Sequence, residues 1–139
     1  MKVLVVGGTS VSGKTAFEAI KELDAANEII TTTSRDNKVD GADITITGIS
    51  LTEDSAEEKI LGSGHCRDID YMIYIPARGQ VGIKAEEATR DMVEESLNYS
   101  FRPFLRLAKE LKPRKSICLS GFITMRPLMQ VYGAMTFNK

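Results

Sequence analysis

The sequence predicts a doubly wound α/β domain, in which helices cover both faces of a parallel β-sheet. Three observations predict it: strand patterns alternate with helical patterns along the chain, the first strand pattern is apolar at nearly every position, and a glycine-rich loop joins that strand directly to a helix. The 139 residues suffice for one three-layer domain with its own core. We therefore expect a single domain over residues 1–139, with about five strands and a ligand at their carboxyl ends.

The first three elements follow from local pattern. Residues 2–6 form a β-branched run that stops at Gly7-Gly8, which is typical of a strand buried on both faces. After the loop, apolar residues recur at helical spacing: Ala16, Phe17, Ala19, Ile20 and Leu23. Isoleucine and threonine then fill most of residues 28–33, which predicts the second strand.

The remaining elements continue this alternation. A third strand is predicted over residues 42–47 and a short helix over 55–61. The fourth strand covers residues 70–75 and ends at Pro76. A long helix is predicted from about Glu86 to Leu111, with Pro113 marking its stop, followed by a fifth strand over 115–120 and a helix that begins at Val131.

Composition and charge exclude several classes of function. Lys and Arg number 18 against 19 Asp and Glu, so the net charge is -1, without the basic blocks that bind nucleic acid or anionic membranes. The two cysteines and the lack of a signal peptide predict reduced thiols and a cytoplasmic location. One histidine with two cysteines falls short of a zinc set, so no metal site is expected.

The loop over residues 7–15 fits two phosphate-binding patterns. Counted from Gly8 it has the P-loop spacing, in which Lys14 reaches the terminal phosphates of ATP or GTP and Thr15 holds Mg²⁺. Counted from Gly7 it is a degenerate dinucleotide loop, in which Gly7 makes the tight turn and Gly13 lets the helix pack closely. In both patterns the N-terminus of the helix offers a positive pole to a phosphate.

The rest of the chain favours the dinucleotide pattern. A P-loop enzyme needs a second strand that ends in an acid to organise Mg²⁺, and no predicted strand ends that way. A dinucleotide site instead expects a discriminating residue at the end of the second strand, an acid for a ribose hydroxyl or an Arg for a 2′-phosphate. Ser34-Arg35 stands there, which predicts NADP as the cofactor.

These segments resemble the short-chain dehydrogenase/reductase family over nearly the whole chain. Residues 5–10 resemble its opening strand and loop, and residues 32–35 resemble the second-strand ending of its NADP-preferring members. Residues 50–54 are similar to the segment that covers the adenine, with Ser50 where an acid is usual. Residues 70–79 resemble the fourth strand and its cofactor-contacting loop, with Ile-Pro-Ala in place of the usual Asn-Asn-Ala.

The resemblance implies a Rossmann-type fold and a set of cofactor contacts. The pyrophosphate is expected at residues 7–13, the 2′-phosphate at Ser34-Arg35, and the remaining contacts after the third and fourth strands. The residues expected to touch NADP are Gly7, Thr9, Ser10, Val11, Ser12, Gly13, Ser34, Arg35, Leu51, Pro76 and Ala77.

The resemblance also implies a catalytic pair. Family members that reduce carbonyls use a Tyr as general acid/base, a Lys four residues later that lowers the Tyr pKa, and a Ser that binds the substrate oxygen. Ser120 and Tyr132 match the Ser and the Tyr, but Thr136 stands where the Lys belongs and Lys139 lies beyond it. A second register puts Gly121, Ala134 and Asn138 at these positions, so the set is incomplete in both.

The predicted function is therefore hydride transfer between NADP and a small carbonyl or hydroxyl substrate. Two alternatives stay open: NADP binding without turnover, and a P-loop NTPase or kinase that uses Gly8 to Thr15. By analogy with the family we expect a homodimer. Because the family's sheet continues after the catalytic helix, we also expect a C-terminally short member that lacks the substrate-loop part.

Overall fold

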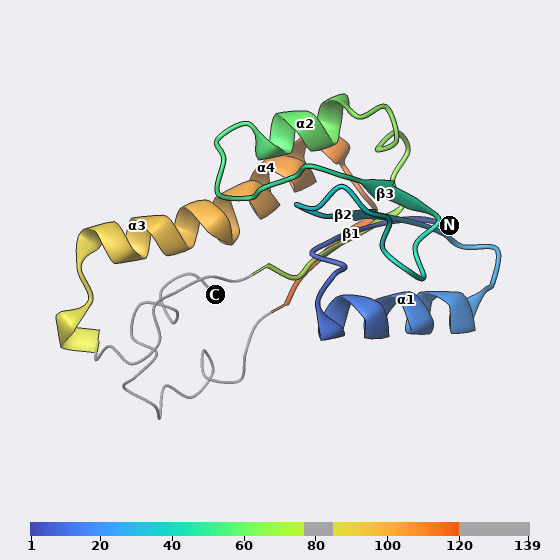
Figure 1. Ribbon diagram of the computed structural model, residues 1–139, viewed down its shortest axis with the longest axis horizontal. Coiled ribbons are helices and arrows are strands. Elements are labelled where there is room, and N and C mark those ends of the chain that lie inside the picture. The colour runs from blue at the N-terminus through green and yellow to red at the C-terminus, as the bar shows by residue number, and fades with distance from the viewer. Residues whose placement is uncertain (77–84, 120–139) are drawn as a thin grey trace.

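The protein is built on a parallel sheet of five strands in the order β3-β2-β1-β4-β5, seen in a computed structural model that describes residues 1–76 and 85–119 (Figure 1). The elements are β1 (Lys2–Val6), α1 (Val11–Leu23), β2 (Glu28–Thr32), β3 (Ile44–Ile46), α2 (Ala56–Gly62), β4 (Tyr71–Tyr74), a 3-10 turn η1 (Ala85–Glu87), α3 (Arg90–Tyr99), α4 (Phe101–Leu111) and β5 (Lys115–Cys118). The predicted doubly wound α/β fold is confirmed.

The strand order places a topological switch point at the end of β1. From β1 the chain moves outward to β2 and β3 on one side, and returns to add β4 and β5 on the other. In open parallel sheets, ligands bind outside the carboxyl ends of the strands at such a point. The glycine loop follows β1 directly, so the fold positions it at the expected site.

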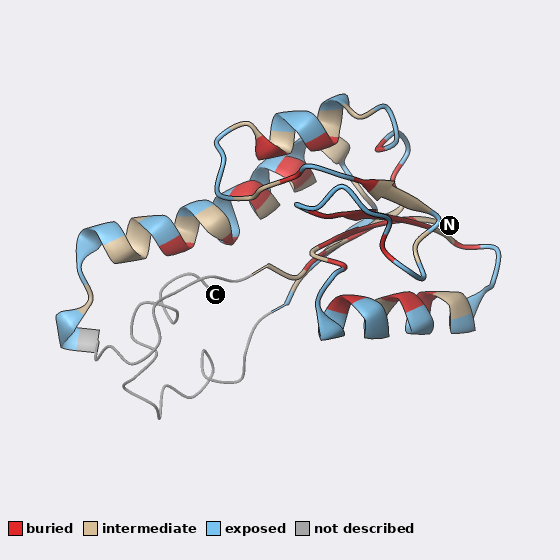
Figure 2. Cartoon of the chain, in the orientation of Figure 1, coloured by how far each residue is buried: buried red, intermediate tan, exposed pale blue. Residues whose placement is uncertain are grey.

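Helices cover both faces of the sheet. Helix α1 packs on one face, and α2 and α4 pack on the other, while α3 extends beyond the carboxyl ends of the strands (Figure 1). The buried side of α1 faces the strands and its outer side is exposed (Figure 2). The smaller core cluster lies under α1 and consists of Val3, Val5, Phe17, Ile20, Ile29 and Val39.

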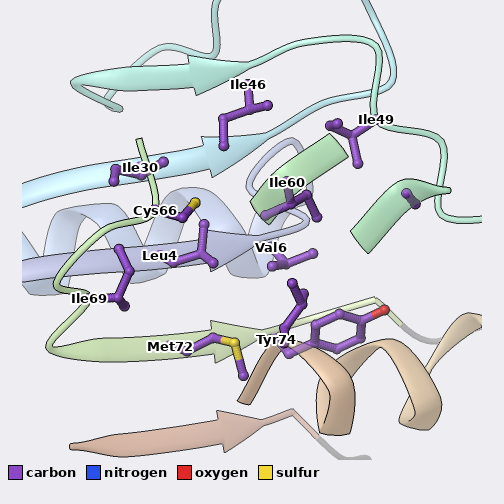
Figure 3. Close-up of a cluster of buried hydrophobic side chains, with 12 residues drawn as sticks. Leu4, Val6, Ile30, Ile46, Ile49, Ile60, Cys66, Ile69, Met72 and Tyr74 are labelled. Carbon is purple, nitrogen blue, oxygen red and sulfur yellow. The ribbon is translucent and has the colours of Figure 1, made fainter. Parts of the chain in front are cut away.

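The larger core cluster fills the face under α2 and α4. Alternate residues of the strands supply half of its buried members, and Ile60 of α2 and Leu107 of α4 cover it on the helical side. Tyr74 lies at its edge, with its hydroxyl pointing out of the cluster (Figure 3). The fully buried members are Leu4, Val6, Ile30, Ile60, Met72, Tyr74 and Leu107.

The single long helix predicted from residue 86 to 111 is wrong, because the structure has two helices separated at Ser100. Pro103 explains the break: it has no backbone N–H, so it cannot bond the carbonyl of Tyr99 four residues earlier. The hydroxyl of Tyr74 donates to that carbonyl at 2.7 Å instead. Helix α4 then ends at Leu111, two residues before Pro113, as predicted. Lys112 follows it in the left-handed conformation.

The helix predicted from Val131 lies outside the described residues. The strands otherwise match their predicted positions, with ends shorter by one or two residues. Among residues 1–76 and 85–119, no helix combines the length and apolar character that a bilayer crossing requires.

A polar cluster joins α1 to β2 and β3 at the opposite end of the sheet from the glycine loop. The Lys21 ammonium donates to the carbonyl of Asn27 at 2.7 Å and forms an ion pair with Asp43 at 2.9 Å. Asp43 also accepts from the backbone N–H of Ile29 at 2.7 Å. The Lys21 hydrogen bond, and then the Ile29 N–H, hold the pKa of Asp43 below its ordinary value of 3.8.

The lowered pKa of Asp43 predicts a pH-dependent contribution to stability. The folded protein binds a proton at Asp43 less readily than the unfolded chain, so the contribution is present at neutral pH and is lost as the pH falls below about 4. Urea unfolding should therefore show wild type more stable than Asp43→Asn at pH 7, with the difference shrinking toward pH 3. A difference of constant size over that range would contradict the assignment.

Candidate functional site

A pocket of about 160 Å³ opens at the carboxyl ends of β1 to β4. Among the residues of 1–76 and 85–119 that line it none is charged, and most of them carry a hydroxyl group. The lining residues are Gly7, Thr9, Thr32, Thr33, Ser34, Ile49, Ser50, Leu51, Thr52, Pro76 and Tyr99. Five of the predicted cofactor contacts are among them: Gly7, Thr9, Ser34, Leu51 and Pro76.

Gly7 forms the turn after β1 against the end of β4. Its φ of +87° lies in the left-handed region, which a glycine adopts without strain. A Cβ at this position would lie 3.0 Å from Cγ of Pro76, so the two strand ends are in close contact. The N–H of Gly7 also points at Oγ1 of Thr32, 3.4 Å away. The sequence-based role of Gly7 as a tight turn thus fits the geometry.

Gly13 brings the first turn of α1 onto the loop. A Cβ on Gly13 would lie 2.5 Å from Cα of Gly8 and 2.7 Å from its carbonyl carbon, and both of these atoms are backbone. Such a distance is far below ordinary contact, so only glycine lets the helix begin here. This is the close helix packing expected of Gly13.

Gly8 is a further position that has no room for a side chain. From the sequence it has a role only in the P-loop pattern. A Cβ on Gly8 would lie 2.1 Å from Oγ1 of Thr31 and 2.4 Å from Cζ of Phe17. Thr31 is fully buried and donates from that oxygen to the carbonyl of Val5 at 2.8 Å. Thr31 and Thr32 of β2 therefore contact the loop directly. Their run in the sequence, which predicts only a strand, was the available signal.

The first turn of α1 presents backbone donors to the site. Ser10 caps the helix, accepting from the N–H of Gly13 at 3.1 Å and donating to the carbonyl of Gly7 at 2.9 Å. The N–H groups of Val11 and Ser12 have no hydrogen-bond partner within residues 1–76 and 85–119. No acidic residue lies in this turn, so the positive end of the helix is available to an anion.

Arg35 directly follows Ser34, which lines the pocket. Its backbone N–H donates to Oγ1 of Thr33 at 3.1 Å, which fixes the chain as it leaves β2. Its side chain is exposed and makes no hydrogen bond or ion pair with any described residue. A guanidinium without a protein partner beside a neutral pocket can bind a phosphate with two parallel hydrogen bonds.

The segment after β3 supplies the far wall of the pocket. Leu51 and Ile49 provide its apolar part, and the hydroxyls of Ser50 and Thr52 are hydrogen-bonded to each other at 2.8 Å. Tyr99, at the end of α3, also lines the pocket, and the sequence did not single it out. The remaining candidates, Ala77, Ser120 and Tyr132, lie outside the described residues.

Two other hollows differ from this pocket in that charged residues line them. One of about 540 Å³ between α2 and α3 shares Leu51, Thr52 and Tyr99 with the pocket. Its acidic lining residues are Glu53, Asp54, Glu57, Asp91, Glu94 and Glu95. The other hollow, on α1, includes Lys14 but none of the residues of the neutral pocket. The P-loop lysine of the alternative pattern therefore faces a different part of the surface.

No protein-family model matches this sequence, and no curated protein matches it, but solved structures share its fold. A short-chain dehydrogenase from Streptomyces avermitilis has a TM-score of 0.77 at 20% identity, over 99% of this chain and 55% of that one. 3-Ketoacyl-(acyl-carrier-protein) reductase from Brucella melitensis, complexed with NADH, has 0.71 at 12% identity, over 98% and 64%. The closed form of serine dehydrogenase, complexed with NADP⁺, has 0.72 at 17% identity, over 98% and 61%.

The chain thus has the Rossmann-type fold of short-chain dehydrogenases, and the predicted resemblance is confirmed at the level of the fold. It spans 55%, 64% and 61% of the lengths of these three proteins. One of these structures is complexed with NADH and another with NADP⁺.

Proposed function

We propose that this chain is the NADP-binding part of an oxidoreductase of the short-chain dehydrogenase/reductase type, which transfers a hydride between NADP(H) and a small carbonyl or hydroxyl substrate. The observation that carries the proposal is the neutral pocket at the switch point, where Gly7 of the turn after β1 meets Pro76 after β4. A dinucleotide in this fold crosses the sheet at that point.

The charges around the pocket support one orientation of the cofactor. The pyrophosphate fits the N–H groups of Val11 and Ser12 at the start of α1, where glycines at positions 8 and 13 leave no room for a side chain. The adenosine fits the uncharged pocket between Ser34 and Leu51. The acidic hollow beyond Tyr99 repels phosphates, so the base faces α3 and the phosphates face the glycine loop.

Arg35 supports NADP over NAD. Its guanidinium is exposed, follows a pocket residue and has no partner within the described residues. A 2′-phosphate on the adenosine ribose would supply that partner. In NAD the same position is a hydroxyl, which a carboxylate binds better than a guanidinium does. The described residues that line this pocket include no carboxylate.

The chemistry would come from the cofactor, which supplies the hydride when it is bound. The protein's part is to hold the cofactor and the substrate and to move a proton, and we assign the proton step to Tyr132 with Ser120 on the substrate oxygen. In sequence, Ser120 follows β5 by two residues, and β5 pairs in parallel with β4. We further propose that the protein is cytoplasmic, a compartment in which the thiols of Cys66 and Cys118 stay reduced.

The same site fits a protein that binds NADP without turnover. Thr136 stands in place of the lysine that lowers the tyrosine pKa, so a phenol with an ordinary pKa of about 10 would transfer its proton poorly near neutrality.

We also propose that two copies pair through the outer face of α4, where Phe101 and Leu105 are 40% and 48% exposed. An exposed apolar stripe of this kind is typical of a subunit contact.

Titration with NADPH and with Mg-ATP tests the proposed cofactor. We expect saturable NADPH binding, followed by the quenching of tyrosine emission or by a thermal shift, and no comparable response to Mg-ATP. Lys14→Ala should leave NADPH binding unchanged, because Lys14 lines a separate hollow. Tight Mg-ATP binding that depends on Lys14, with no response to NADPH, would overturn the proposal in favour of the P-loop pattern. Where NADPH binds, oxidation of it on a panel of small carbonyls separates an enzyme from a sensor.

A further inference from the structure

The carbonyl of Tyr99 accepts a hydrogen bond from the side chain of Tyr74. In an unbroken helix this carbonyl would accept from the N–H of residue 103, and Pro103 has none. The Tyr74 hydroxyl takes that place at 2.7 Å. A side chain of the sheet therefore completes a bond that the α3–α4 segment lacks.

Tyr74 holds both sides of the helix break. Its hydroxyl binds the last residue of α3, and its ring packs edge-on against Phe104 of α4, with centroids 6.0 Å apart and an interplanar angle of 60°. The residue is fully buried, so its orientation is set by packing on all sides. Burial raises the pKa of the hydroxyl above its ordinary value, which keeps it protonated and able to donate.

The same contacts connect to the neutral pocket. Tyr99 lines the pocket from α3, and Pro76, two residues after Tyr74, lines it from β4. The Tyr74 hydroxyl thus fixes the separation between two walls of the pocket. The ring contact with Phe104 adds a second link between β4 and this helix pair.

We propose that Tyr74 is a positioning residue for the cofactor: by donating to the Tyr99 carbonyl, with which Pro103 cannot make the usual helical hydrogen bond, it holds Tyr99 against the pocket that takes the purine end of the dinucleotide. The inference rests on the proposed function. It assigns to Tyr74 and Pro103 an effect on ligand affinity, although neither lines the pocket.

Tyr74→Phe tests the role, because it removes the hydroxyl and keeps the ring. Loss of one buried hydrogen bond corresponds to about a tenfold change in an equilibrium constant. We expect NADPH and adenosine 2′,5′-bisphosphate, a probe of the purine end alone, to bind more weakly by about this factor. Nicotinamide mononucleotide, which lacks the purine, should bind unchanged. Tyr71→Phe is the matched control, since its hydroxyl has no partner among the described residues and it lies on the other face of β4.

Rescue separates positioning from general destabilisation. In Pro103→Ala the N–H of residue 103 can bond the Tyr99 carbonyl, so Tyr74→Phe should have little effect on NADPH affinity in that background. In the double variant Tyr74→Phe/Pro103→Ala the Tyr99 carbonyl still accepts a hydrogen bond, from residue 103. Its NADPH affinity can therefore be measured even if Tyr74→Phe alone folds poorly. Unchanged NADPH affinity in Tyr74→Phe, equal weakening of the mononucleotide, or an undiminished effect in the Pro103→Ala background would overturn the role. Failure of wild type to bind NADPH would instead overturn the proposed function, and this role with it.

Discussion

Gly13→Ala is expected to lower the free energy of unfolding by about 3 kcal/mol and to abolish NADPH binding. The new methyl group would lie 2.5 Å from Cα of Gly8 and 2.7 Å from its carbonyl oxygen. Because these are backbone atoms, no side-chain rotation can relieve the overlap, and α1 or the loop after β1 must move. Either shift displaces the N–H groups of Val11 and Ser12, on which the phosphate site depends.

Urea unfolding followed by circular dichroism measures the effect, and Gly62→Ala is the matched control. Gly62 ends helix α2, and a Cβ there would meet no atom within 4 Å. Alanine has the higher helix propensity, so Gly62→Ala should be neutral or slightly stabilising. If Gly13→Ala were as stable as wild type and still bound NADPH, the close contact between α1 and the loop could not be the reason for glycine at this position.

The fold could be predicted from the sequence because its signals are local. The run over residues 2–6, the break at Gly7-Gly8 and the apolar spacing of α1 each lie within a few residues of one another, and together they imply a parallel sheet. The predicted turn at Gly7 and the close packing at Gly13 also follow from local signals. Each follows from a glycine at a junction between two recognisable elements.

Contacts between distant segments could not be predicted in this way. The break at Ser100 depends on Pro103, which a helical pattern can contain near its start, and on a tyrosine 25 residues before Tyr99. The fit of Gly8 depends on Thr31, whose hydroxyl turns to the carbonyl of Val5. Both require knowledge of which strands are neighbours and which way each side chain points, and a single sequence gives neither.

Arg35→Ala is expected to weaken NADPH binding by about 100-fold and to change NADH binding by less than twofold. The guanidinium is exposed and has no hydrogen bond or ion pair among the described residues, so its removal disturbs no internal contact. Its effect must therefore come from the ligand. Only NADPH carries the 2′-phosphate that the guanidinium would bind, which is why the two cofactors should respond differently.

Titration of both cofactors against wild type, Arg35→Ala, Arg35→Lys and Lys38→Ala measures the difference. Arg35→Lys keeps the charge but loses the paired donors, so it should fall between wild type and alanine. Lys38→Ala removes an exposed cation from the same loop without touching the pocket, and it should leave both affinities near wild type. Added salt should weaken NADPH binding to wild type more than to Arg35→Ala, since it screens the charge pair that the variant lacks. Equal losses of NADPH and NADH affinity in Arg35→Ala would mean that Arg35 contacts a part common to both cofactors. A preference for NADP would then have to come from another residue.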